Sequence, residues 1–222
     1  MVKALIFDFD GTILDTETPW YYAYRDLYSQ YSVDLPLEEW GQCVGTSFEA
    51  FDPHRNLEEK TRRTFVYEEL QAYTRDKHIE YMAKQTLRPA ILEYLEAAKQ
   101  AGLRLAIPSS ARREWIDKYL AAYNIADYFE HIASADDVTE VKPSPELYLK
   151  ALELLQIEPN EAIAFEDSKH GLFAAKAAGI RTVVTPNDVT SYMIFENYDL
   201  LLSSLADISL EELLKQMAES KI

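Results

Sequence analysis

The sequence predicts an α/β protein in which a parallel sheet carries helices on both faces and a separate, all-helical segment is inserted near the amino terminus. Three observations support this fold class. Short apolar runs recur along the chain between turn residues, amphipathic helical patterns separate them, and one long stretch has helical patterns without any such run. Strands that alternate with helices are typical of a parallel sheet covered on both faces.

The first strand is expected at residues 4–7, where Ala-Leu-Ile-Phe leads into an Asp and a Gly-containing turn. Short apolar runs between turn residues are typical of buried strands. Similar runs lie at 103–107, 162–165 and 182–184, with weaker ones at 131–133 and 200–202.

Between these runs, apolar residues recur every three or four positions, which is the spacing of one helix face. Two such faces lie within residues 115–120 and 147–155. A third helix is expected at 169–178, which is rich in alanine and is followed by Gly179. Glycine commonly stands just after the last residue of a helix.

Residues 16–86 differ from the rest of the chain because they contain no clear buried strand. A stripe of tyrosines between positions 21 and 31 has helical spacing, and we interpret it as packing within a helical unit. We predict that 16–86 is a helical cap domain, inserted into a discontinuous core of residues 1–15 and 87–222.

Charge and cysteine content restrict the partners and the compartment. Acidic residues outnumber basic ones, 38 to 22, for a formal net charge of −16. Such a surface repels nucleic acid and anionic lipid, so we expect neither as a partner. No stretch approaches the roughly 18 apolar residues of a membrane span. The single cysteine, Cys43, cannot form an internal disulfide, which favours a reducing, cytoplasmic location.

Four polar groups stand where predicted strands end or beside them, and loops at the carboxyl ends of parallel strands form the usual binding crevice. We therefore expect their side chains to meet. The groups are Asp8-Phe9-Asp10-Gly11-Thr12, Ser109-Ser110, Lys142-Pro143 and Glu166-Asp167-Ser168.

These residue types suit phosphoryl transfer to a carboxylate. Asp8 can attack the phosphorus and form an aspartyl phosphate, and Asp10 can act as general acid and base. Because a carboxylate and a phosphate repel each other, a cation is needed, and Mg²⁺ with the oxygen ligands Asp8, Asp10 and Asp167 would provide it. Lys142 and Ser109 can hold the remaining phosphoryl oxygens.

Each group also has a simpler explanation when taken alone. The Asp-Gly-Thr could be only a turn, Ser109 and the 166–168 group could cap helices, and Lys142 could be a surface lysine. All of these explanations would have to hold together and in this order, which disfavours them as a set. Ser110 could share the phosphate contact, and Thr12 is a further candidate for it.

In order and spacing, the four groups resemble the four motifs of the haloacid dehalogenase superfamily, and the resemblance runs from Val2 to about Thr185. The helical insertion resembles the cap of the phosphoglycolate phosphatase and β-phosphoglucomutase type. The resemblance implies a Rossmann-like core, Mg²⁺ as cofactor and a cap that closes over the substrate.

The resemblance also implies a role for each matching residue. Asp8 is the nucleophile and Asp10 the acid/base, whose backbone carbonyl reaches the metal. Asp167 ligates the metal with support from Glu166, while Ser109 and Lys142 contact phosphate. Asp10 argues against the dehalogenases proper, which are similar but lack this aspartate and the metal.

Two departures from the family pattern bear on the reaction. Sugar phosphomutases of this type commonly have a histidine where this chain has Trp20, and an arginine after Gly-x-Ser where Phe48 follows Gly45-Thr46-Ser47. Both differences favour hydrolysis of a substrate with one phosphate over a β-phosphoglucomutase-like reaction. Arg88-Pro89-Ala90, in place of the usual Arg-Pro-Gly, is interpreted as structural.

Two classes of binding protein are alternatives to an enzyme of this kind. A calcium loop of the EF-hand type fails, because Ile13 and Pro19 occupy the positions that need Gly and Glu. An inactive family member that only binds is the remaining alternative, although every catalytic position is filled. By fold-level analogy, we expect a small sugar or organic-acid phosphate as substrate and a monomer or weak homodimer.

Overall fold

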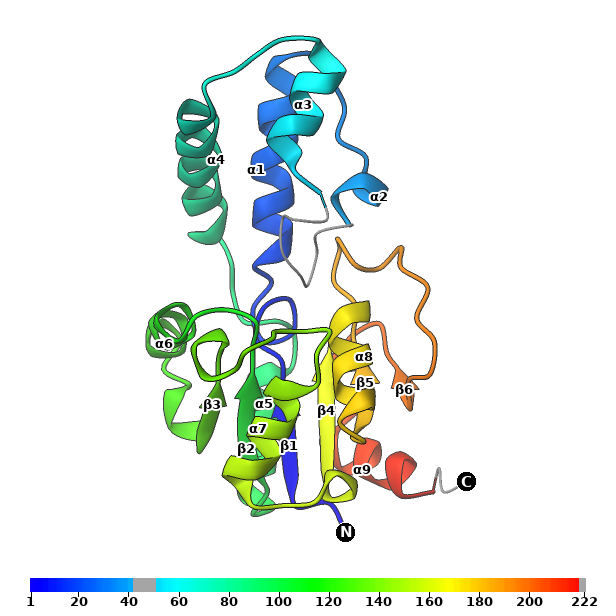
Figure 1. The fold of residues 1–222 in the computed structure, drawn as a ribbon. Coiled ribbons are helices and arrows are strands. Elements are labelled where there is room, and N and C mark those ends of the chain that lie inside the picture. Colours follow the sequence, from blue (N-terminus) through cyan, green and yellow to red (C-terminus); the bar gives the residue numbers. More distant parts are fainter. Residues whose placement is uncertain (42–50, 220–222) are drawn as a thin grey trace.

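The computed structural model describes residues 1–41 and 51–219, and its centre is a parallel sheet with the strand order β3-β2-β1-β4-β5-β6 (Figure 1). All six strands coincide with the predicted runs to within one residue at each end, so these predictions are confirmed. The strands are β1 (Ala4–Phe7), β2 (Arg104–Pro108), β3 (His131–Ala133), β4 (Ala162–Glu166), β5 (Arg181–Val184) and β6 (Leu200–Leu201).

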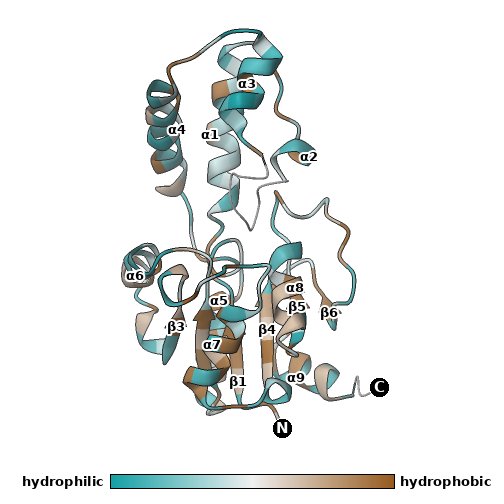
Figure 2. Cartoon of the chain, viewed as in Figure 1, coloured by the Kyte–Doolittle hydropathy of each residue, from teal (hydrophilic) through white to brown (hydrophobic). Residues whose placement is uncertain are grey.

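Alternate residues of β1 face opposite sides of the sheet, and each side has its own helices. Leu5 and Phe7 belong to the cluster with α5 (Ile91–Gln100), α6 (Arg113–Ala122) and α9 (Leu210–Glu219). Ala4 and Ile6 belong to the cluster with α7 (Glu146–Leu155) and α8 (Lys169–Ala177). Because both sides are buried, the central strands have continuous apolar sequences, and Figure 2 shows the hydrophobic colour concentrated in β1, β2 and β4.

The predicted helices of the core form where the apolar spacing places them. Gly179 follows α8 with φ +79°, a left-handed conformation that glycine adopts without a steric penalty. Short 3₁₀ turns complete the connections, at Ala126–Tyr128, Ala135–Asp137, Pro159–Glu161 and Leu205–Asp207.

Four helices lie apart from the sheet, beyond the carboxyl ends of its strands (Figure 1). They are α1 (Glu17–Gln30), α2 (Leu37–Trp40), α3 (Pro53–Thr61) and α4 (Tyr67–Met82). Their shared apolar cluster, here called the cap cluster, contains two members of the predicted tyrosine stripe, Tyr24 and Tyr28, both buried. The other buried members are Leu27, Leu35, Trp40, Phe51, Leu57, Leu70 and Val189.

The chain leaves the sheet and returns to it through two segments that touch. Leu14 pairs with Leu87 in an isolated antiparallel bridge, and the Arg88 amide donates to the Ile13 carbonyl. The Arg88 guanidinium donates to the carbonyls of Gly11 and Thr185 at 2.5 and 2.7 Å and to that of Pro186 at 2.8 Å. Arg88 therefore ties the returning segment to the loops after β1 and β5, in agreement with its structural interpretation.

Candidate active site

Asp8 follows the last residue of β1, and the strand order places it at the centre of the sheet edge. Its amide donates to the Phe165 carbonyl of β4 at 3.0 Å. Because β2 and β4 flank β1 on opposite sides, the residues that follow all three strands share one crevice. Asp8 is 5% exposed. Burial raises the pKa of its carboxyl to about 8, although the positive charge of Lys142 opposes this shift.

Lys142 holds two of the predicted carboxylates together. Its ammonium donates to Asp8 Oδ1 and, at 2.7 Å, to Glu166 Oε1. Glu166 Oε1 also accepts from the Tyr148 hydroxyl at 2.5 Å, and the Tyr148 ring lies 5.3 Å from the ammonium. Burial works against a charged lysine, but the two carboxylates outweigh it and raise the pKa of Lys142.

Asp167 lies beside this pair and completes an acidic cluster. Asp8, Glu166 and Asp167 each offer a carboxylate oxygen, and these oxygens lie within 4.8 Å of one another. Burial, followed by the charges of Asp8 and Glu166, raises the pKa of Asp167 well above its usual range. Among the described residues, Lys142 is the cation that hydrogen-bonds to this cluster, so three carboxyl groups face one ammonium group.

Two glycines leave room for this cluster. A Cβ at Gly11 would come within 2.2 Å of Asp167 Oδ2, and a Cβ at Gly171 within 1.9 Å of Glu166 Oε2. Glu166 Oε2 is itself buried without a hydrogen-bond partner among the described residues. A hard divalent cation fits this cluster, because it would neutralise carboxylate charge and can take this oxygen as a ligand.

Asp10 lies at the same edge, but its carboxylate is held by three other groups. Oδ1 accepts from the Thr16 hydroxyl at 2.8 Å and from the Trp115 indole at 2.9 Å, and Oδ2 accepts from the Ser109 hydroxyl at 3.2 Å. Burial raises the pKa of Asp10, and these three hydrogen bonds oppose the shift. A raised pKa brings a carboxyl closer to the range in which it can serve as a general acid.

The two serines after β2 play different parts. Ser109 is fully buried, and its hydroxyl accepts from the Ala111 amide at 3.0 Å while it donates to Asp10. Ser110 lines a cavity at this edge of the sheet, and its buried hydroxyl has no hydrogen-bond partner among the described residues. Thr12 is buried and its hydroxyl is likewise unpartnered there, but Thr12 does not line that cavity.

A cavity of about 400 Å³ opens onto these groups from the side of the helical insertion. Its wall includes half-buried Glu17, whose pKa is raised to about 8 by burial and then by the charges of Asp10 and Asp15. The lining residues are Asp8, Asp10, Thr16, Glu17, Trp20, Ser110, Ala111, Arg112, Trp115, Lys142 and Ser168. The cavity therefore joins the predicted nucleophile to the first helix of the insertion.

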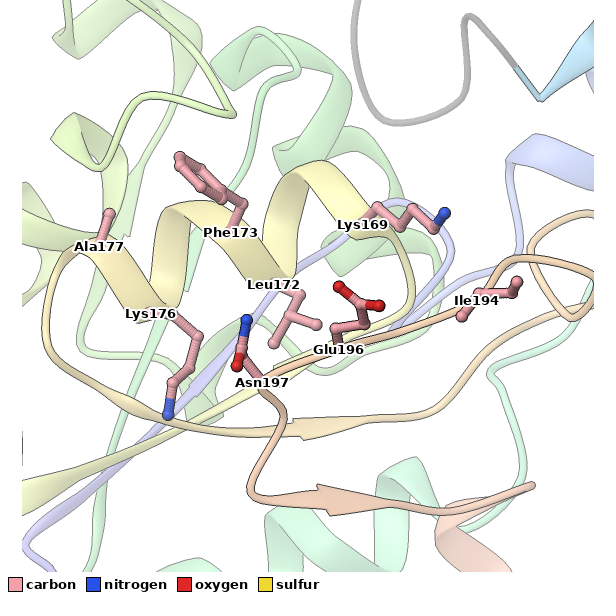
Figure 3. Close-up of a pocket in the computed structure, with 8 residues that line it drawn as sticks. All are labelled: Lys169, Leu172, Phe173, Lys176, Ala177, Ile194, Glu196 and Asn197. Carbon is pink, nitrogen blue, oxygen red and sulfur yellow. The ribbon is translucent and has the colours of Figure 1, made fainter.

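Another hollow, of about 690 Å³, lies on the outer surface between α8 and residues 194–197 (Figure 3). Its wall contains exposed Phe173 and Ile194 together with Lys169 and Lys176. None of the predicted catalytic, metal or phosphate-binding residues lines this hollow, so it does not compete with the crevice as the reaction site.

Trp20, which stands where phosphomutases have histidine, stacks on another ring. The Trp20 ring lies 3.8 Å from that of His78 in α4, with their planes 9° apart, and His78 in turn stacks at 6.0 Å on Trp115 of the core. The second departure, Gly45-Thr46-Ser47-Phe48, lies outside the described residues, and so does Cys43.

Several residues of this site are absent from the sequence predictions. Trp115 was assigned only to a helix face, yet its indole binds Asp10. Tyr148 follows Lys142 by six positions and holds Glu166. Asn187 donates to Asp167 Oδ2 at 2.7 Å from the loop after β5. The carboxyl-edge rule could have suggested Asn187, since it follows a predicted strand.

No helix among the described residues is long and apolar enough to cross a membrane. Residues 5–185 match the family described as haloacid dehalogenase-like hydrolase. The chain is 43% identical to a Bacillus subtilis protein named "Putative phosphatase YhcW", covering 98% of both chains. It is 36% identical to Protein CbbY of Rhodobacter capsulatus, covering 85% of this chain and 87% of the relative.

Solved structures give the same result. The crystal structure of CbbY from Rhodobacter sphaeroides in complex with phosphate superimposes with a TM-score of 0.71 and 30% identity, covering 95% of this chain and 98% of that one. A CbbY variant in complex with xylulose-(1,5)bisphosphate gives a TM-score of 0.72 at the same identity and coverage. The chain therefore belongs to the haloacid dehalogenase-like hydrolases and is a phosphoric monoester hydrolase of that family.

Proposed function

We propose that the protein hydrolyses a small phosphomonoester, a sugar or organic-acid phosphate, with Mg²⁺ as cofactor and Asp8 as nucleophile. The observation that carries this proposal is the buried group of Asp8, Glu166 and Asp167 with Lys142, from which Asp8 and Lys142 line a cavity that reaches the helical insertion. A single buried lysine among three carboxylates suits a site that receives both a cation and a phosphate.

Asp8 is suited to attack because one of its oxygens is left free. Lys142 occupies Oδ1, whereas Oδ2 accepts no hydrogen bond from the described residues. Attack by this oxygen on phosphorus would break the bond to the leaving oxygen, which takes a proton from Asp10. Water would then attack the aspartyl phosphate and give its proton to Asp10, which releases phosphate and restores Asp8.

Mg²⁺ held by Asp8 and Asp167, with support from Glu166 and the backbone carbonyl of Asp10, would neutralise phosphoryl charge during the attack. Lys142, which donates to Asp8 and lines the cavity, would stabilise the phosphoryl oxygens together with Ser109, Ser110 or Thr12. Of these three residues, Ser110 is the one that lines the cavity, and its buried hydroxyl has no hydrogen-bond partner among the described residues.

The helices of residues 16–86 would serve as the cap over this cavity, on a core of residues 1–15 and 87–222. Trp20 from α1 and Trp115 from α6 line the cavity from the two sides. A roofed cavity of this volume favours a small substrate over a phosphoprotein. The binding of xylulose-(1,5)bisphosphate by a CbbY variant and the relative named phosphorylated carbohydrates phosphatase from Thermotoga maritima, 31% identical, support a sugar phosphate.

The test is release of phosphate from p-nitrophenyl phosphate and from a panel of sugar and organic-acid phosphates, with Mg²⁺ or with EDTA. We expect Mg²⁺-dependent turnover, which Asp8→Asn lowers by about 10⁴- to 10⁶-fold because it removes the nucleophile. Asp127→Asn makes the same chemical change at an exposed aspartate at the other end of the sheet and should leave the rate unchanged.

Three outcomes would contradict parts of this proposal. No turnover on the whole panel would favour an inactive binding protein, and full activity in EDTA would exclude the metal. Conversion of β-glucose 1-phosphate to its 6-phosphate would establish the mutase that Trp20 disfavours. A cytoplasmic location and a monomer or weak homodimer are further expectations, which fractionation and analytical ultracentrifugation would check.

A further inference from the structure

The loop after β5, residues 185–193, touches both the acidic cluster and the helical insertion. We call it the strap. It begins beside the segment that returns from the insertion to the sheet, where the carbonyls of Thr185 and Pro186 accept from the Arg88 guanidinium. It then rises from β5 toward the base of the insertion beside α2 (Figure 1). The strap thus connects the core to the helical insertion by packing, in addition to the two chain segments that join them covalently.

Asn187 is the strap residue that reaches the acidic cluster, and its orientation is fixed. Its Oδ1 accepts from the Val189 amide at 3.0 Å and from the amide and hydroxyl of Thr190, both at 3.1 Å. An amide oxygen with three donors around it must point into the strap, so Nδ2 points the other way. There it donates to Asp167 Oδ2 at 2.7 Å, and Asn187 is only 6% exposed.

Val189 and its neighbours attach the strap to the insertion. Val189 is 1% exposed and belongs to the cap cluster with residues of α1, α3 and α4, and Met193 packs against the same cluster. The Tyr192 ring covers Gly41, where a Cβ would come within 1.2 Å of the tyrosine oxygen. Val189 therefore anchors the strap two positions after Asn187, with an apolar side chain that belongs to the cap cluster.

We propose that Asn187 is a positioning residue for Asp167 and that Val189 makes its position depend on the cap. This inference rests on the proposed metal site. With the strap seated in the cap cluster, Asn187 holds the Asp167 carboxylate toward Asp8 and Glu166, in the arrangement that receives the cation. Residues that orient a metal ligand typically change metal affinity 10- to 100-fold when they are removed. By reciprocity, metal binding would also favour the seated strap.

The test measures Mn²⁺ binding by electron paramagnetic resonance, without substrate, so that it does not depend on turnover. Asn187→Ala should weaken Mn²⁺ binding by about 10-fold. Val189→Ala keeps the backbone donor to Asn187 but shortens the cap anchor, and it should weaken binding by about 3-fold. If Val189 acts through Asn187, the double variant should bind as weakly as Asn187→Ala and no more weakly.

Leu70→Ala is the matched control, since it shortens a side chain of α4 in the same cap cluster and leaves every residue of the strap unchanged, and its Mn²⁺ affinity should equal that of the wild type. Thermal unfolding in EDTA shows that each variant folds. Unchanged binding in Asn187→Ala, additive losses in the double variant, or an equal loss in Leu70→Ala would each overturn the inference. A wild type that binds no Mn²⁺ would overturn it together with the proposed metal site, which is a distinct result.

Discussion

The sheet edge and the helical insertion bury their polar groups in opposite ways. At the edge, Asp8, Lys142 and Glu166 are buried as ionisable groups that hold one another by hydrogen bonds. In the insertion, His54 and His78 are buried among rings, and the Nε2 atom of each lacks a hydrogen-bond partner among the described residues. Burial lowers the pKa of both histidines, so they are neutral near pH 7.

This difference separates chemistry from selectivity. A group of paired charges tolerates little change, because removing one member leaves the others buried and unpaired. A cluster of rings depends mainly on shape and volume, so it accepts isosteric substitution. We therefore expect the edge to determine the reaction and the insertion to vary with the substrate.

The largest effect on stability is expected for Lys142→Met, which keeps the side-chain length but removes the cation between two buried carboxyl groups. Activity should fall by about 10²- to 10³-fold, and the free energy of unfolding by about 3–5 kcal/mol, measured by steady-state kinetics and urea denaturation. The control is Lys150→Met, whose ion pair with Glu153 is at the surface, and it should change stability by less than about 1 kcal/mol. Equal losses of activity and stability in the two variants would show that the buried Lys142 matters no more than a surface lysine.

The pH dependence of the metal effect is the second test of the edge. The pKa of Asp8 is about 8 in the metal-free fold and 3.8 ordinarily, so the folded protein retains a proton that the unfolded chain releases. This stabilisation is present at low pH and is lost as the pH rises through about 8, by about 1.4 kcal/mol for each pH unit and proton. Mg²⁺ competes with that proton.

Mg²⁺ should therefore raise the midpoint of thermal unfolding, relative to EDTA, by more at pH 8 than at pH 6. Differential scanning calorimetry at the two pH values measures the effect, and Asp8→Asn should reduce its pH dependence. A metal effect of the same size at both pH values would contradict the assignment of the buried carboxylates as the metal site.

In the insertion, His78→Phe should leave stability at pH 7 within about 1 kcal/mol of the wild type, because the ring stack on Trp20 is kept. Relative to His78→Phe, the wild type should lose on the order of 2 kcal/mol of stability as the pH falls from 6.5 toward 4. Over that range the unfolded chain gains a proton that buried His78, with a pKa of about 4, does not accept. Urea titrations of both proteins at both pH values measure this change as a difference between them, so the titration of Asp8 and of the other shared groups cancels. A large loss for His78→Phe at pH 7 would mean that the ring nitrogen has a polar role.

The smallest effect is expected at the seam between the two regions. Ala90 precedes α5 with φ +63°, a left-handed conformation that costs alanine about 1 kcal/mol relative to glycine. Ala90→Gly should raise the free energy of unfolding by about 0.5–1 kcal/mol in urea titrations. The matched control, Ala98→Gly inside α5, should lower it by about 1 kcal/mol. A gain in both variants would show that the effect is not specific to the backbone conformation at position 90.

The sequence by itself determined the six strands, the order of the motifs and the meeting of Asp8, Ser109 and Asp167 at one edge. These features follow from local apolar patterns and from the rule that parallel strands end on the same side of their sheet. Lys142 could be included because phosphoryl oxygens need a cationic partner and because its motif resembles one of the four family motifs.

Only the tertiary structure decided which side chains support these residues. Trp115 reaches Asp10 from α6, Tyr148 reaches Glu166 from within α7, and Asn187 reaches Asp167 from the strap. None of these contacts has a fixed sequence spacing, because each depends on how a helix or loop packs against a strand end far away in the chain. The spacing of apolar residues and the strand order place the backbone. Hydrogen-bond partners must lie within a few tenths of an ångström of the right distance, and only the packed fold sets that distance.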